Sequence, residues 1–157
     1  MKNKFPVVIF VFLLTALLFS CGNAKKDINI DVSEVALKLS SELASEKAGL
    51  VELTEDSSAI RYGIGGLYSK IYCEASATVA SDEFAVIEAN DEQAAGKIVS
   101  KLDAYRKERI SLFASYAASE VPKLEDALLE SEGKYVIFVS SDKLDAAKEI
   151  WNSEKRQ

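Results

Sequence analysis

The stretch GKYVIFV, residues 133–139, decides the fold that this sequence can adopt. Five consecutive apolar residues, Tyr135 to Val139, follow the Gly-Lys pair, and another partly apolar segment, 127–132, precedes it. Two residues with glycine first, between two such segments, are typical of a β-hairpin turn. A strand that is apolar on both faces belongs in the centre of a sheet, where both faces can be covered. The sequence therefore predicts a hairpin over 127–140 whose second strand is central.

A second hairpin is expected earlier in the chain. From Leu67 to Val79 apolar and polar residues alternate, which predicts a strand with Cys73 on its buried face. The Ser-Asp-Glu segment at 81–83 is typical of a turn, and residues 84–89 are predicted to return as the partner strand.

Helical periodicity and capping residues mark the segments between and around the hairpins. The expected helices are 32–47 capped by Asp31, a short turn from Thr54 to Tyr62, a long helix capped by Asn90 and ending near Tyr116, and a last helix capped by Ser141 or Asp142. These elements follow the order α-ββ-α-ββ-α. The prediction is an α+β fold, with an antiparallel sheet of about four strands and helices packed against it.

Three main helices are expected to cover one face of such a sheet well and the other only partly. Ile137 and Phe138 point to opposite faces of the central strand. We therefore expect one of them in the main core and the other beneath a connecting segment or in a binding surface.

The N-terminal segment predicts export and a lipid anchor. Lys2 and Lys4 precede an apolar run that is too short to span a bilayer but suits a signal peptide. The run ends Leu18-Phe19-Ser20-Cys21, which resembles the lipobox of bacterial lipoproteins, in which the cysteine receives the lipid. We expect residues 1–20 to be a lipoprotein signal peptide, residues 21–30 a tether, and residues 31–157 a single α+β domain. Lipid on Cys21 would hold this domain at the extracytoplasmic face of the cell membrane.

The composition excludes several kinds of site and partner. The sequence has no histidine and two cysteines, which removes His-dependent nucleophilic triads and zinc sites built from Cys and His. No metal site and no cofactor are predicted. Loss of Lys2 and Lys4 with the signal peptide would take the formal net charge from −6 to −8. Nucleic acid is not an expected partner, because an acidic surface repels phosphate backbones.

No catalytic residues are predicted, and three tyrosines are the candidates for binding. Tyr62, Tyr68 and Tyr72 lie close together in the sequence, where residues 50–64, which are expected to be a connector, meet the first strand of the earlier hairpin. Tyrosines at a rim suit ligand surfaces because one end is apolar and the other polar, although they also pack sheet edges.

Cys73 is expected to be a core residue, because it alternates with Ile71 and Ala75 on the inward face of the strand. No histidine is present to activate it as a nucleophile. The acidic pairs, among them Asp82-Glu83, are explained by helix starts and turns.

Several short motifs resemble those of one bacterial lipoprotein family. Together with the lipobox, these are Tyr62-Gly63-Ile64, Glu83-Phe84-Ala85-Val86, residues 121–127 and Gly133-Lys134-Tyr135-Val136. They are similar to the family known only as domain of unknown function 4358. The resemblance would cover about residues 32–151, and it implies one folded unit at the cell surface. The family has no assigned activity or catalytic residues, so the resemblance implies no chemistry.

The preferred hypothesis is a non-enzymatic binding or interaction module displayed on the membrane, with an unknown protein or small-molecule partner. One alternative is a hydrolytic or redox enzyme that uses carboxylates or Cys73. The other is a structural accessory subunit of a surface complex.

Overall fold

The computed structural model describes residues 28–156, so the predicted signal peptide, Cys21 and most of the predicted tether lie outside the described residues. The elements are α2 Val32–Leu43, β1 Leu50–Glu52, α3 Glu55–Tyr62, β2 Tyr68–Ser76, β3 Glu83–Ala89, α4 Glu92–Tyr116, the 3-10 helix η2 Ala118–Glu120, α5 Val121–Glu125, β4 Leu128–Glu132, β5 Tyr135–Ser140 and α6 Leu144–Glu154. The predicted α+β class is confirmed. None of the helices within residues 28–156 is long and apolar enough to cross a membrane.

The sheet has five antiparallel strands in the order β1-β2-β3-β5-β4. Both predicted hairpins are confirmed, and β5 lies between β3 and β4 as expected for a central strand. The prediction of about four strands missed β1, which lies in the segment expected to be a connector. Only three residues long, with Val51 and Glu52 exposed, β1 shows no alternation of buried side chains that could have marked it.

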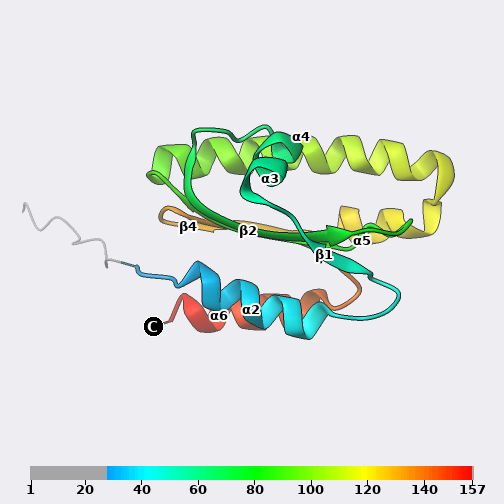
Figure 1. The fold of residues 1–157 in the computed structure, drawn as a ribbon, viewed down its shortest axis with the longest axis horizontal. Coiled ribbons are helices and arrows are strands. Elements are labelled where there is room, and N and C mark those ends of the chain that lie inside the picture. The colour runs from blue at the N-terminus through cyan, green and yellow to red at the C-terminus, as the bar shows by residue number, and fades with distance from the viewer. Residues whose placement is uncertain (1–27, 157) are drawn as a thin grey trace, which may run out of the picture.

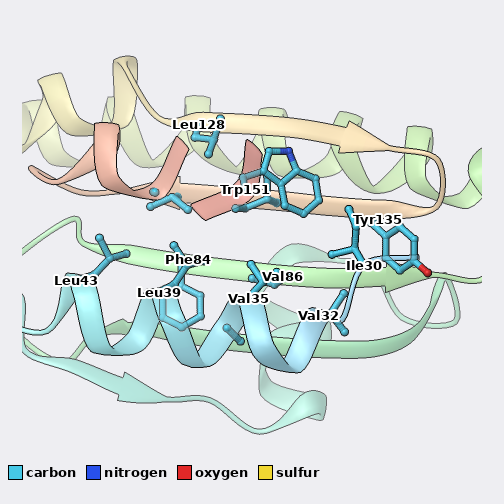
Figure 2. Packing of buried hydrophobic residues seen from close by; sticks show 14 residues of the cluster. Ile30, Val32, Val35, Leu39, Leu43, Phe84, Val86, Leu128, Tyr135 and Trp151 are labelled. Atoms are coloured by element: carbon cyan, nitrogen blue, oxygen red, sulfur yellow. The ribbon is translucent and has the colours of Figure 1, made fainter. Parts of the chain in front are cut away.

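Helices cover both faces of the sheet (Figure 1). Helices α2 and α6 lie on one face, and α3 and α4 lie on the other. In the core between the sheet and α2, Val35 and Leu39 lie against Phe84 and Val86 of β3 (Figure 2). The opposite core joins α3 and α4 to alternate residues of the same strands, among them Phe138. The central strand is therefore buried from both sides.

The expectation that one face of the central strand is only partly covered is wrong. Ile137 belongs to the core beneath α2 and α6, Phe138 belongs to the core beneath α3 and α4, and neither side chain is exposed. The reason is that the helix after the first hairpin, α4, and the helix after the second hairpin, α6, pack on opposite faces of the sheet.

Several predicted boundaries are corrected by local hydrogen bonding. Helix α2 is capped by Asp31 as expected but ends at Leu43, four residues early. Helix α4 is capped by Asp91, whose Oδ1 accepts from the Ala94 N–H at 2.7 Å, and not by Asn90. Asn90 instead donates from Nδ2 to the carbonyl of Gly66 at 2.9 Å.

The last helix and the first hairpin also differ from the expectation. Helix α6 begins at Leu144 without a side-chain cap, so neither Ser141 nor Asp142 caps it. Strand β2 ends at Ser76, and residues 77–82 form the hairpin loop, in which the Val79 side chain is exposed. Glu83, expected in the turn, is the first residue of β3.

Candidate functional site

The three candidate tyrosines do not form one surface. Tyr62 is 3% exposed and lies in the core beneath α3 and α4, and Tyr68 packs at the edge of the same core. Tyr72 is 38% exposed and faces α2 on the opposite side of the sheet. A register shift between Tyr68 and Lys70 separates Tyr68 from Tyr72, because it interrupts the alternation that would place residues four apart on one face. The sequence gives no sign of this bulge.

A buried ionic cluster occupies the α3–α4 face where β3 begins. The Glu83 side chain is 1% exposed, and its Oε2 accepts hydrogen bonds from Arg61 Nε at 3.1 Å and Nη2 at 2.8 Å. The Tyr105 hydroxyl donates to the same oxygen at 2.9 Å. Burial, and next the Glu83 carboxylate, raise the pKa of Tyr105 well above its ordinary value, so this hydroxyl stays protonated and keeps donating. Arg61 balances the charge of Glu83, although Oε1 of this carboxylate is buried and has no hydrogen-bond partner within residues 28–156. Burial keeps the carboxylate away from any substrate, which suits stability better than catalysis.

A second buried ionic cluster lies beside the first. Lys123 of α5 pairs with Asp82 and Glu120, and all three side chains are buried. The backbone N–H of Ser81 donates to Glu120 Oε2 at 2.9 Å, which ties the start of β3 to η2. Sequence reasoning missed both clusters because it assigned Asp82-Glu83 to an exposed turn. The available signal was the apolar run that starts at Phe84, directly after these two acids, because residues beside a buried strand segment often lie at the edge of the core.

Cys73 lies in the core, as predicted. Its side chain is 2% exposed, and the Sγ atom is 3.0 Å from the Tyr62 hydroxyl. Burial raises the pKa of the Cys73 thiol to about 11, so the nucleophilic thiolate is scarce near neutral pH. This environment disfavours the reactive-thiol alternative.

Two measurements test the placement of Cys73. A thiol reagent should label the folded protein slowly and the denatured protein quickly, and Cys73→Ala should cost about 1 kcal/mol of unfolding free energy. The folded pKa lies above the unfolded one, so the native state holds this proton more tightly and stability should fall as the pH rises from about 9 to about 11. The alanine variant should lose this part of the alkaline decline. Rapid labelling of the native protein would contradict a buried thiol.

On the face of the sheet that carries α2 and α6, a groove lies between α2 and the strands β1 and β2, here called the α2–β1–β2 groove. Its volume is about 230 Å³. Its lining includes Ser33, Leu37 and Ser40 of α2, Glu52 of β1, and Tyr72 and Glu74 of β2. Short side chains explain its existence: Ser33 and Ser40 lie two turns apart on one stripe of α2 and leave space where larger residues would reach the sheet.

Leu37 separates this groove from a second hollow. That hollow, of about 380 Å³, lies between α2 and α6 and is lined by Leu37, Lys38, Ser41, Glu42 and Ile150. The Leu37 side chain is 72% exposed although it projects from the middle of a helix. An exposed leucine between two hollows, near an exposed tyrosine, suits contact with a partner.

Two carboxylates lie side by side on the sheet side of the α2–β1–β2 groove. Glu52 and Glu74 are directly opposite in the β1–β2 register. Hydrogen bonds from the Leu53 N–H to the Cys73 carbonyl and from the Ala77 N–H to the Gly49 carbonyl fix the ladder pattern. This pattern makes Glu52–Glu74 a non-hydrogen-bonded pair, in which opposite side chains are closest. Within residues 28–156 neither carboxylate has an ion pair or a side-chain hydrogen bond.

Glu74→Gln is expected to stabilise the protein. Like charges directly opposite on two strands are destabilising, and removing one should raise the unfolding free energy by about 0.2–1 kcal/mol. Thermal or urea unfolding measures the change, with Glu46→Gln as the control because Glu46 is exposed and lies outside the sheet. A destabilised Glu74→Gln protein would show that the carboxylate has a favourable partner.

Within residues 28–156 no group of three or more acidic, cysteine or histidine side chains could hold a metal ion. Comparison with known proteins finds the model of one family, described as "Domain of unknown function (DUF4358)", over residues 50–141. This region contains all five strands together with α3, α4 and α5, while α2 and α6 lie outside it. No curated protein and no solved structure matches the sequence. The match covers more than half of the chain, which therefore belongs to the DUF4358 family.

Proposed function

We propose that this protein is a lipid-anchored surface protein whose domain is a non-enzymatic binding module, and that it holds its partner in the α2–β1–β2 groove. The observation that carries the proposal is the groove itself, where Leu37 and Tyr72 expose apolar surface beside the Glu52–Glu74 pair. Apolar and aromatic side chains that stay exposed in a hollow are typical of recognition surfaces.

The chemical groups that an enzyme would need do not support the alternative. Cys73 is a protonated, buried thiol, and the Asp82 and Glu83 carboxylates are closed in ion pairs with Lys123 and Arg61. A catalytic group must reach its substrate, directly or through one water molecule. The α2–β1–β2 groove offers two carboxylates, a phenol and hydroxyls. These groups line an open groove and do not converge in a buried pocket, as the polar groups of an active site do.

The anchor is supported by the sequence before the described residues. The apolar run and Leu18-Phe19-Ser20-Cys21 indicate lipid on Cys21, and α2 begins only eleven residues later, at Val32. A linker of this length is short, so the groove on α2 would stay near the membrane.

Cys21→Ser should abolish lipidation. The variant is expected to remain as precursor or to be released, because no thiol is left to accept the lipid and two or more acyl chains are needed for stable anchoring. Detergent phase partition and mass measurement check this, with Cys73→Ser as the matched cysteine control. Wild-type mature protein in the aqueous phase would contradict the anchor.

Site-specific photo-crosslinking in intact cells tests the binding role. A crosslinker in place of Tyr72 should trap a partner, and Leu37→Ser should reduce the trapping by removing apolar contact. The control crosslinker replaces Ile60, which is 83% exposed on α3, on the other side of the sheet. Equal adducts from positions 72 and 60, or adducts insensitive to Leu37→Ser, would contradict the groove as the binding site.

A further inference from the structure

Strand β1 is an open edge of the sheet. It pairs with β2 on one side only, and it is one of the two outermost strands of the sheet, β4 being the other. Because Gly49 and Leu53 bond toward β2, the alternation of an antiparallel ladder directs the backbone groups of Leu50 and Glu52 outward. An edge of this kind is a template for an added strand.

The side chains of this edge divide between the two faces of the sheet. Leu50 packs against the core beneath α2, and Glu52 lines the α2–β1–β2 groove on the same face. Val51 points to the other face and is 47% exposed. A strand added to β1 would therefore meet apolar side chains at two positions and a carboxylate at the third.

Within residues 28–156, no lysine or arginine forms an ion pair with the carboxylate at the third position or with its neighbour Glu74. Glu74 lies directly behind Glu52, so a residue opposite Glu52 on an added strand would stand in one row with both acids. Lysine or arginine at that place could reach both carboxylates and relieve their repulsion. Tyr72, two residues from Glu74 on the same strand face, adds an aromatic ring for the cation or its aliphatic stem.

The same charges argue against a second copy of this chain at the edge. Pairing β1 with β1 would bring further carboxylates beside the Glu52–Glu74 pair, and each whole chain carries a formal net charge of −6. Charge complementarity selects a basic partner.

We propose that the partner is a protein segment in extended conformation, which adds to the free edge of β1 and places a lysine or arginine over the Glu52–Glu74 pair. Its residues opposite Val51 and Leu50 are apolar. This inference rests on the proposed binding function and names the chemistry of its partner. The backbone bonds give affinity, and the basic residue sets the register.

The probe is a short fluorescein-labelled lysine–valine peptide that contains the order Lys-Val-Val, so that antiparallel pairing places lysine opposite Glu52 and valine opposite Val51 and Leu50. Binding to the full chain in detergent micelles is followed by fluorescence anisotropy. Glu52→Gln with Glu74→Gln should weaken binding about tenfold, since two partly exposed ion pairs are lost. The matched control is Glu46→Gln with Glu149→Gln, which removes the same charge from exposed positions and should leave affinity within about twofold.

Two further probes separate strand pairing from simple charge attraction. A peptide N-methylated on alternate residues keeps every charge but cannot donate to β1, and it should bind at least about tenfold more weakly. Free lysine amide should not compete at the peptide's concentration. The inference would be overturned by any one of three results. The Glu52→Gln, Glu74→Gln variant and the matched control could weaken binding equally, the methylated peptide could bind fully, or lysine amide could compete.

The crosslinking experiment at position 72 distinguishes the failure of this inference from failure of the proposed function. If the lysine–valine peptide does not bind but the crosslinker at Tyr72 still traps a partner that depends on Leu37, the groove is a binding site for other chemistry and only the basic strand is wrong. If both fail, the proposed function is wrong as well.

Discussion

Phe138→Ala is expected to lower the unfolding free energy by about 3–5 kcal/mol, through lost burial and the cavity left behind. The Phe138 ring is fully buried, and it packs edge-on against Tyr62 at 6.5 Å and Tyr105 at 6.3 Å between ring centroids. The substitution also removes these aromatic contacts. It leaves Tyr105, which donates to Glu83 in the buried cluster, less tightly packed. Urea unfolding followed by circular dichroism measures the loss.

Ile137→Ala should also be costly, at about 2–5 kcal/mol, because the opposite face of the same strand is covered by α2 and α6. Val79→Ala is the control: Val79 is exposed in the β2–β3 loop, and its replacement should change stability by less than about 0.5 kcal/mol. A large loss from Phe138→Ala with almost none from Ile137→Ala would mean that the α2–α6 layer does not cover the sheet.

The parts of the fold that the sequence predicts are those set by local patterns. Continuous apolar residues from Tyr135 to Val139 place the central strand, and Gly133-Lys134 places its turn. The αL conformation of Gly63, with φ of 64°, ends α3 where the glycine suggested a break. Each of these signals lies within a few residues of its effect.

The parts that the sequence does not predict depend on partners distant in the chain. Strand β1 exists because Leu50–Glu52 finds β2, more than twenty residues later. The two buried acids at the start of β3 depend on Arg61 and Lys123, and nothing in the spacing of these residues pairs them. Burying a carboxylate costs free energy unless a cation or hydrogen-bond donor lies beside it. The burial of these two acids therefore follows from the folded arrangement and cannot be inferred from their own part of the sequence.

The candidate site combines both kinds of residue. Tyr72 was proposed from the sequence, and the structure places it in the groove, away from Tyr62 and Tyr68. Leu37 belongs to an expected helix, but its exposure follows from how α2 is rotated on the sheet. The Glu52–Glu74 pair could not be anticipated, since it requires the register of a strand that the sequence does not mark.

Arg61→Met is expected to cost about 3 kcal/mol or more, because it leaves the Glu83 carboxylate charged and enclosed with only the Tyr105 hydroxyl as donor. Most of that loss would come from the unpaired carboxylate and little from the pair's own attraction. Replacing Glu83 by glutamine in the same chain removes the charge while retaining the shape. The double variant should therefore be more stable than Arg61→Met alone.

A double-mutant cycle of Arg61→Met and Glu83→Gln measures this coupling by urea unfolding, and an interaction energy of about 1–3 kcal/mol is expected. The control cycle uses Lys107→Met and Asp103→Asn, a pair on the outer side of α4 in which Lys107 is well exposed; it should give less than about 0.5 kcal/mol. Additive losses at Arg61 and Glu83 would show that water reaches the carboxylate. In that case the start of β3 would be an open acidic site, and a catalytic role for Glu83 would again need to be tested.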